Sequence, residues 1–277
     1  MFFFKKTTFP VFKSPKFAAM TLHFYKYQGA GNDFVILDNR NQTYALTRAQ
    51  INFLCDRRFG IGADGLMLLE QADGYDFKMV YYNADGNESS MCGNGGRCIT
   101  AFARQIGIGE TEHFFIAVDG AHKAFIKADG QVSLQMQDID HIEFGAAETI
   151  LNTGSPHYVS FQQDIDQINV YAEGKRIRNQ ERFQPKGINV NFVAVVPEGL
   201  TIRTYERGVE DETLACGTGV TAAAIASVCG QTGHFEVAVA AKGGKLQVSF
   251  DKTDKTTVRN VWLTGPAKMV FEGNITI

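Results

Sequence analysis

An internal match between the two halves of the chain constrains the fold more than any other feature. The segments MVYYNADGNESSMCGNGGRCITAFA and TIRTYERGVEDETLACGTGVTAAAIA share one order: strand, acidic loop, cysteine, glycine turn, helix. Tyr82 lies ten residues before Cys92, and Tyr205 lies eleven residues before Cys216. GAGNDFV in the first half is loosely echoed by NTGSPHYV in the second. The pattern predicts a tandem duplication of a domain, with a site in the cleft between the halves.

Strands are expected to dominate both halves, because short apolar and alternating segments are separated by turns. The first half contains LHFYKY, DFVILD, GLMLLE and DFKMVYY. A second series runs from Glu112 to Gly265 and includes HYVSF, INVYAE, VNFVAVV and KLQVSF. Because strands greatly outnumber helical windows, the sequence predicts an α+β fold and not an α/β fold with alternating strands and helices and a parallel sheet.

Four helical windows interrupt the strands. TRAQINFLCDRRFG is expected to start after Thr47 and to end at Gly60. Two more helices are expected directly after Cys92 and Cys216, and a fourth around residues 174–183. The two helices that follow the repeated cysteines therefore occupy equivalent places in the duplicated domains.

Composition excludes several classes of function. The 277 residues are 44% hydrophobic and 21% charged, with a formal net charge of −3 and scattered Lys and Arg, which gives no support to a nucleic-acid partner. No run approaches the ~18 apolar residues of a membrane span. Five cysteines, an odd number in a chain with a sizeable core, indicate reduced thiols and a cytoplasmic protein. Residues 1–19 hold four lysines and no acid, and prolines and lysines interrupt them; we interpret them as a disordered or over-annotated leader.

The two repeated cysteines are the candidate catalytic groups. If Cys92 and Cys216 each precede a helix, unpaired N–H groups and the helix dipole should stabilise a thiolate and bring its pKa below about 8.5. The glycines that follow, beginning with Gly93 and Gly217, allow N–H groups to point at an anion such as a carboxylate. Two facing thiols suit the removal of a proton from one side of a carbon and its delivery to the other. Such chemistry inverts a stereocentre without pyridoxal phosphate.

From Leu22 to Ile277 the chain resembles the diaminopimelate epimerase family. The matching motifs occur in the family's order: GAGNDFVILD, RRFGIGADG, YYNADGNESSMCGNGGRC, GSPHYV, INVNFV and YERGVEDETLACGTG. The combination is specific, whereas a glycine turn alone would be weak evidence.

The resemblance implies two pseudo-symmetric domains, each a mixed β-sheet wrapped around a central helix. The expected boundaries are 20–137 plus 265–277 for the N-terminal domain and 138–264 for the C-terminal domain. It also implies a homodimer that interconverts LL- and meso-2,6-diaminopimelate for lysine and peptidoglycan synthesis, with no cofactor and no metal.

The resemblance further assigns roles to residues. Cys92 and Cys216 are implied as the acid and base, and Arg207 suits a two-pronged contact to the distal carboxylate. The implied substrate-binding residues are Asn32, Asn83, Gly93, Asn94, Asn189, Glu206, Arg207, Gly217 and Thr218. His157 and Ser155 are expected in supporting roles. This chain has Ser155 and Gly65 where many family members have asparagine and glutamine, so two substrate contacts are expected to differ.

Other interpretations remain open. A buried structural role for Cys92 alone is common for free cysteine, and Cys55, Cys98 and Cys229 are expected to serve packing. The C-x5-C spacing from Cys92 to Cys98 does not match a usual zinc site. A redox protein with a Cys92–Cys216 disulfide, a binding module without catalysis, and a proline or hydroxyproline racemase are the remaining alternatives.

Overall fold

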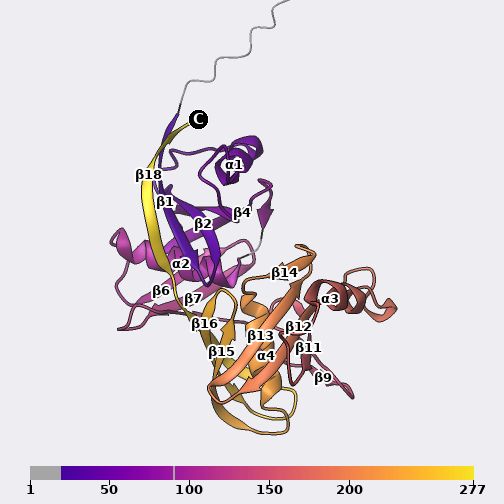
Figure 1. Cartoon of the computed structure of the whole chain (residues 1–277). Coiled ribbons are helices and arrows are strands. Elements are labelled where there is room, and N and C mark those ends of the chain that lie inside the picture. Colours follow the sequence, from indigo (N-terminus) through magenta and orange to yellow (C-terminus); the bar gives the residue numbers. More distant parts are fainter. Residues whose placement is uncertain (1–19, 90) are drawn as a thin grey trace, which may run out of the picture.

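Residues 20–89 and 91–277 are described by a computed structural model, which forms two lobes joined along one sheet (Figure 1). The leader predicted for residues 1–19 lies outside the described residues. The strand-rich α+β architecture predicted from the sequence is confirmed.

In the first lobe, a mixed sheet curls around helix α2 (Gly93–Gln105). Its strands are β1 (Thr21–Gly29), β2 (Asn32–Asp38), β3 (Gly65–Glu70), β4 (Phe77–Asn83), β5 (Glu88–Ser89), β6 (Glu112–Ala117), β7 (Gly120–Ile126) and β8 (Val132–Gln135). Strands β2 and β3 pair in parallel across α1 (Arg48–Cys55), and β4 and β6 pair in parallel across α2. Hairpin connections make β3–β4, β6–β7 and β7–β8 antiparallel.

The second lobe repeats this topology around helix α4 (Gly217–Ser227). Its strands are β9 (Ile142–Phe144), β10 (Thr149–Asn152), β11 (Pro156–Phe161), β12 (Asn189–Val196), β13 (Gly199–Glu206), β14 (Asp211–Thr213), β15 (Gly233–Ala241), β16 (Gly244–Lys252) and β17 (Val258–Gly265). Here β11 and β12 are parallel across α3 (Val170–Arg178) and the short helix η1 (Glu181–Phe183), and β13 and β15 are parallel across α4. The duplication inferred from the repeated motifs is therefore visible strand by strand.

The lobes exchange their last strands. Strand β9 follows β8 of the first lobe but pairs with β10 of the second. Strand β18 (Lys268–Thr276) follows β17 of the second lobe but runs along β1 of the first (Figure 1). Strands β8 and β17 pair antiparallel where the lobes meet. We propose domain boundaries that follow this exchange, with 20–137 and 265–277 in one domain and 138–264 in the other.

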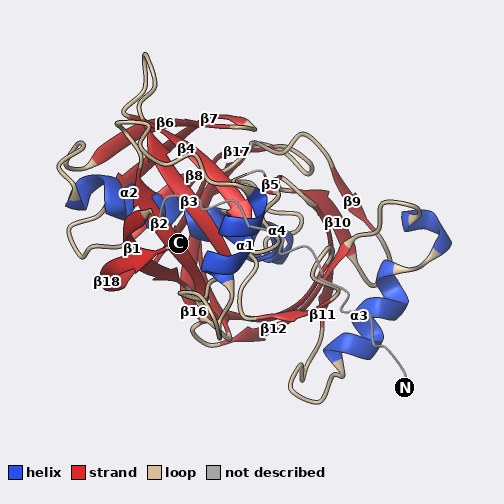
Figure 2. Ribbon diagram, turned by 90° about the horizontal axis from the view of Figure 1, so that it is seen from above, coloured by secondary structure: helices blue, strands red, loops and turns tan. Residues whose placement is uncertain are grey.

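Helices α2 and α4 form the core of their lobes because small residues let the strands approach them closely. In α4, GTGVTAAAIAS is buried from Val220 to Ala226, and the strands surround it in Figure 2. Helices α1 and α3 lie outside the sheets and bury only one face each, as amphipathic surface helices do. Among the described residues, none of the helices is long and apolar enough to cross a bilayer.

Two local predictions are wrong for identifiable reasons. Thr47 caps α1 in a reciprocal capping box with Gln50, as expected, but the helix ends at Cys55 and not at Gly60. The Asp56 carboxylate accepts hydrogen bonds from the backbone N–H groups of the next turn and ends the helix there. INVYAE, predicted as a strand, contributes the start of α3, because the Asn169 side chain caps the helix by accepting from the backbone of Ala172.

Candidate active site

A cavity of about 790 Å³ lies between the lobes, a size suited to a small-molecule ligand. Strands β4 and β5 and the start of α2 line one wall, and β13, β14 and the start of α4 line the other. The cavity brings together every sequence-predicted site residue except His157, which is fully buried behind the wall. These lining residues are Asn32, Asn83, Cys92, Gly93, Asn94, Ser155, Asn189, Glu206, Arg207, Cys216, Gly217 and Thr218.

Helices α2 and α4 meet at their N-termini in this cavity. A methyl group built on Gly217 would lie 3.7 Å from Cα of Gly93 and 3.0 Å from a side-chain carbon of Leu263. Both glycines permit this close approach of the two helix ends. Two positive dipole ends therefore converge on one place, which favours a bound anion.

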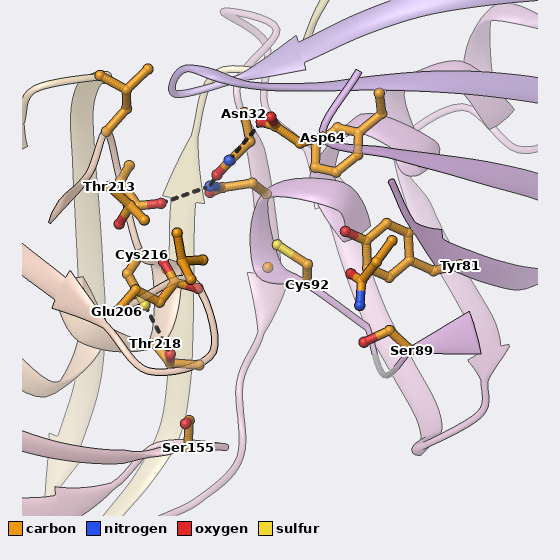
Figure 3. A pocket seen from close by; sticks show the side chains of 18 of the residues that line it. Asn32, Asp64, Tyr81, Ser89, Cys92, Ser155, Glu206, Thr213, Cys216 and Thr218 are labelled. Atoms are coloured by element: carbon orange, nitrogen blue, oxygen red, sulfur yellow. Dashed lines mark hydrogen bonds between the residues drawn. The ribbon is translucent and has the colours of Figure 1, made fainter. Parts of the chain in front are cut away.

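Cys92 and Cys216 are the N-cap residues of these helices. Both have extended backbone, and their carbonyls accept the first helical hydrogen bonds, from Gly96 and Val220. Neither caps its helix through a side-chain hydrogen bond. Both cysteines line the cavity, one from each lobe (Figure 3).

The prediction of lowered thiol pKa values is wrong. Burial raises the pKa of Cys92, although N–H groups of Gly95 and Asn94 and the charge of Arg97 oppose it. Burial, followed by the Glu206 carboxylate, raises the pKa of Cys216 to about 12. Desolvation of the thiolate outweighs the helix N-terminus in both cases. Each thiol is therefore a poor acid and, once deprotonated, a strong base.

Glu206 is the last residue of β13 and lines the cavity. Burial raises the pKa of its carboxyl, and the charge of Asp64 adds to this, although the nearby Thr213 hydroxyl opposes it. The same carboxylate raises the pKa of both cysteines. Glu206 thus strengthens both thiolates as bases.

A buried hydrogen-bond chain leads from His157 to Cys216. The Nδ2 group of Asn191 donates to His157 Nδ1 over 3.1 Å, because Oδ1 of Asn191 already accepts from Thr204. Nε2 of His157 must then carry the proton and donate to Thr218 Oγ1 over 2.8 Å. Thr218 Oγ1 lies 3.4 Å from the sulfur of Cys216 and can donate to it.

Burial lowers the pKa of His157 to about 3, and the charge of Arg207 acts in the same direction. The imidazole is therefore neutral at physiological pH and does not serve as a charged partner of either thiol. His157 contacts Thr218 but does not line the cavity itself, and its supporting role stays a prediction.

Arg97 is a fully buried cation directly behind Cys92. Its guanidinium donates to the carbonyl of Gly93 over 3.2 Å and to Oδ1 of Asn94 over 2.8 Å. Asn94 consequently turns its Nδ2 group toward Oδ1 of Asn32 and the carbonyl of Ala215, the residue before Cys216. Arg97 therefore orients a side chain that links the two walls of the cavity.

An ion-pair cluster holds the Asn32 side chain from the first lobe. Nδ2 of Asn32 donates to the carboxylate of Asp64 over 2.9 Å, and Arg57 bridges Asp64 and Asp33. Burial favours the neutral form of Asp33, but Arg57 and Lys26 outweigh it and hold the pKa of Asp33 at about 2. Asp33 therefore stays ionised, and the cluster fixes the Asn32 side chain at the cavity.

Ser155, where the resemblance led us to expect asparagine, remains part of the site. Its hydroxyl accepts from Nδ2 of Asn189 over 2.8 Å and from Nη2 of Arg207 over 3.3 Å. Oδ1 of Asn189 in turn accepts from the backbone of Arg207 over 2.9 Å. The three side chains form one polar wall at the end of the cavity away from Asp64.

Sequence reasoning missed several cavity and support residues. Those in the cavity wall include Asp64, Tyr81 and Thr213, and Arg97 lies behind it. Asp64 and Arg97 stand inside motifs already singled out, GIGADG and GNGGRC, so charge within a matched motif was the available signal.

The remaining cysteines divide between two environments. Cys55 and Cys98 are buried, as the packing prediction requires, and Cys55 also reaches the cavity wall. Cys229 is exposed beyond the end of α4, and the prediction that it packs is wrong, since the helix ends at Ser227.

Comparison with known proteins shows to which family the chain is similar. A family model described as diaminopimelate epimerase matches residues 24–142 and 149–270. A diaminopimelate epimerase of Flavobacterium psychrophilum is 50% identical over 254 residues, which cover 91% of this chain and 99% of the relative. A diaminopimelate epimerase of Chlorobaculum tepidum is 44% identical over 259 residues and covers 90% and 99%, respectively.

Solved structures share the fold at low sequence identity. A PhzF-family phenazine biosynthesis protein of Bacillus anthracis aligns with a TM-score of 0.74 at 13% identity, covering 93% of this chain and all of its own. A hydroxyproline epimerase of Agrobacterium vitis aligns with a TM-score of 0.68 at 14% identity, covering 92% and 91%. At such identities the likeness concerns the fold alone.

Proposed function

The chain belongs to the diaminopimelate epimerase family, and from this premise we infer that its two cavity thiols perform the epimerisation. The reaction converts LL-2,6-diaminopimelate to the meso form, and its product feeds lysine and peptidoglycan synthesis. The observation that supports the thiol mechanism most strongly is the convergence of Cys92 and Cys216, each at a helix N-terminus, on opposite walls of one cavity.

Inversion needs one base and one acid on opposite faces of the α-carbon. One cysteine, as thiolate, removes the α-proton, and the other, as thiol, donates its proton to the opposite face. The α-proton is weakly acidic, so a thiolate whose pKa is raised by burial is better matched to removing it. In the reverse direction the two cysteines exchange roles, and no pyridoxal phosphate is required.

The helix N-termini supply the electrostatic part of the mechanism. We place the reacting carboxylate at the backbone N–H groups of Gly93, Asn94, Gly217 and Thr218, where negative charge develops as the carbon loses its proton. Burial in the cavity strengthens these interactions, because few water dipoles screen them.

The distal end of the substrate needs groups for a second amino acid head. Arg207 suits the distal carboxylate, and the carboxylate of Glu206 suits an ammonium. The amides of Asn32, Asn83 and Asn189 can both donate and accept, which fits a carboxylate beside an ammonium.

We also propose a cytoplasmic homodimer. Met269, Val270 and Phe271 expose large apolar side chains on the outer strand β18, which supports a surface covered by a second copy. Light scattering after size-exclusion chromatography should give twice the mass of one chain, which is 30.6 kDa. A mass of one chain at all concentrations would contradict the dimer.

The substrate assignment is tested with purified protein and LL-diaminopimelate in reducing buffer, with proline in a parallel tube. Appearance of meso-diaminopimelate and unchanged proline are expected. Racemised proline with unchanged diaminopimelate would show that proline, and not diaminopimelate, is the substrate. Oxidation of the two thiols to a disulfide should stop turnover, and a reductant should restore it; turnover that requires the disulfide would favour the redox alternative.

A further inference from the structure

Tyr81 stands in the cavity wall with an unused hydroxyl. The residue lies on β4, and only 8% of its surface is exposed. It lines the cavity, and its hydroxyl points to the side on which Cys92 lies (Figure 3). None of the hydrogen bonds between described residues involves this hydroxyl, so it is left open to the cavity that Tyr81 lines. A ligand in the cavity would supply a hydrogen-bond partner.

Gly65 makes room for the phenol ring. A methyl group at this position would lie 2.5 Å from ring carbon Cε2 of Tyr81 and 2.9 Å from its hydroxyl oxygen. It would also lie 2.5 Å from the carbonyl oxygen of Tyr82, so no side chain fits there without movement of β4. The glycine that replaces the expected glutamine thus coincides with a tyrosine that fills the vacated space with another hydrogen-bonding group.

The ring is held in place, and its hydroxyl keeps its proton. Phe34 packs edge-on against the Tyr81 ring, with centroids 6.0 Å apart at 74°. Burial, with the charges of Cys92 and Asp64 next, raises the pKa of Tyr81 above its ordinary value. Throughout the physiological range the phenol can therefore donate one hydrogen bond and accept others.

We propose that Tyr81 is a substrate-binding residue, whose hydroxyl hydrogen-bonds the amino acid head of diaminopimelate that lies against the first-lobe wall beside Cys92. The inference rests on the proposed function and extends it, because Tyr81 takes over a polar contact that the resemblance assigned to a side chain at position 65. The phenol holds the substrate in the ground state and takes no part in proton transfer, which belongs to the thiols.

The test is the kinetics of Tyr81→Phe, with Tyr82→Phe as the matched control. Tyr82 is the next residue of β4, but it packs against the apolar cluster under α1 and does not line the cavity. Tyr81→Phe should raise KM for LL-diaminopimelate about tenfold, with kcat within twofold and the melting temperature unchanged, since one hydrogen bond to a charged group is lost. Tyr82→Phe should leave KM unchanged.

Three results separate the possibilities. An unchanged KM for Tyr81→Phe, with an active wild-type enzyme, would overturn the role of the phenol. A lower kcat at unchanged KM would also overturn it, because the hydroxyl would then act on the chemical step. If the wild-type enzyme showed no activity on diaminopimelate, the proposed function itself would be refuted.

Discussion

At the scale of single residues, burial decides the chemistry of the two thiols. The sequence places Cys92 and Cys216 before glycine turns and helices, and this much could be predicted. Their raised pKa values could not, because desolvation depends on the opposite lobe and on Glu206, which lie far away along the chain or across the cleft. Tyr81 was missed for a similar reason, since its place in the wall depends on the absence of a side chain at Gly65.

Each thiol should be indispensable. Cys92→Ser and Cys216→Ser are each expected to reduce epimerisation by about three orders of magnitude or more, because a serine hydroxyl is a far weaker acid than a thiol. Turnover is measured by the formation of meso-diaminopimelate, with Cys229→Ser, at an exposed cysteine, as control. Near-normal turnover by either cavity variant would refute the paired-thiol mechanism.

Glu206→Gln should lower the pKa of both thiols. The Glu206 carboxylate raises both values, so its replacement by a neutral amide removes that effect and leaves more thiolate at a given pH. Mass spectrometry can monitor the alkylation of Cys92 and Cys216 by iodoacetamide between pH 7 and 10. In the variant, the alkylation rate should be higher and should begin to increase at a lower pH than in the wild type. If the pH dependence of alkylation were unchanged or moved to higher pH in the variant, the Glu206 carboxylate would not raise the thiol pKa.

At the scale of elements, strong local sequence patterns predicted helices and strands correctly. Continuous apolar segments such as DFVILD and GLMLLE form β2 and β3, and Thr47 caps α1, as predicted. INVYAE failed because its β-branched and aromatic residues favour a strand, whereas the cap at Asn169 and packing against β12 and β13 make it helical. The two-residue strand β5 could not be predicted from local patterns, and the place of residues 265–277 in the first domain was expected only from the family resemblance, because both depend on pairing with other segments.

The first turn of α4 provides a test at this scale. A methyl group on Gly219 would lie 2.5 Å from Oδ1 of Asn191 and 3.4 Å from Cε1 of His157. Gly219→Ala should therefore displace the chain of hydrogen bonds behind Cys216, reduce the free energy of unfolding by about 1–3 kcal/mol and lower kcat.

Gly95 is the matched control, since it holds the equivalent position in α2. A methyl group there would meet side-chain atoms of Met67, Met79 and Phe34, at 3.4, 3.5 and 3.7 Å, which is ordinary contact. Gly95→Ala should retain or slightly increase stability, because alanine favours a helix. Urea denaturation compares the two variants; equal losses would mean that crowding at Asn191 is not the cause.

At the scale of the whole molecule, the duplicated topology explains why the site needs both halves. The repeated motifs predicted two domains and a cleft, whereas the placement of β9 and β18 in the opposite lobe was expected only from the family resemblance, because it depends on long-range pairing. Each half contributes one helix N-terminus and one thiol, and neither half alone can place groups on both faces of a carbon. The symmetric fold thus matches a reaction that must run in both directions across one carbon.

Solvent deuterium at low conversion tests this central claim most directly. LL-diaminopimelate is converted in D2O under reducing conditions, and NMR and mass spectrometry follow deuterium at the α-carbons of product and remaining substrate. Two thiols on opposite faces predict meso product with one deuterium at the inverted carbon, because the donating thiol has exchanged with solvent, and early substrate still unlabelled. Product that retains the original proton at that carbon would mean that a single group removes and returns it, and would contradict the account.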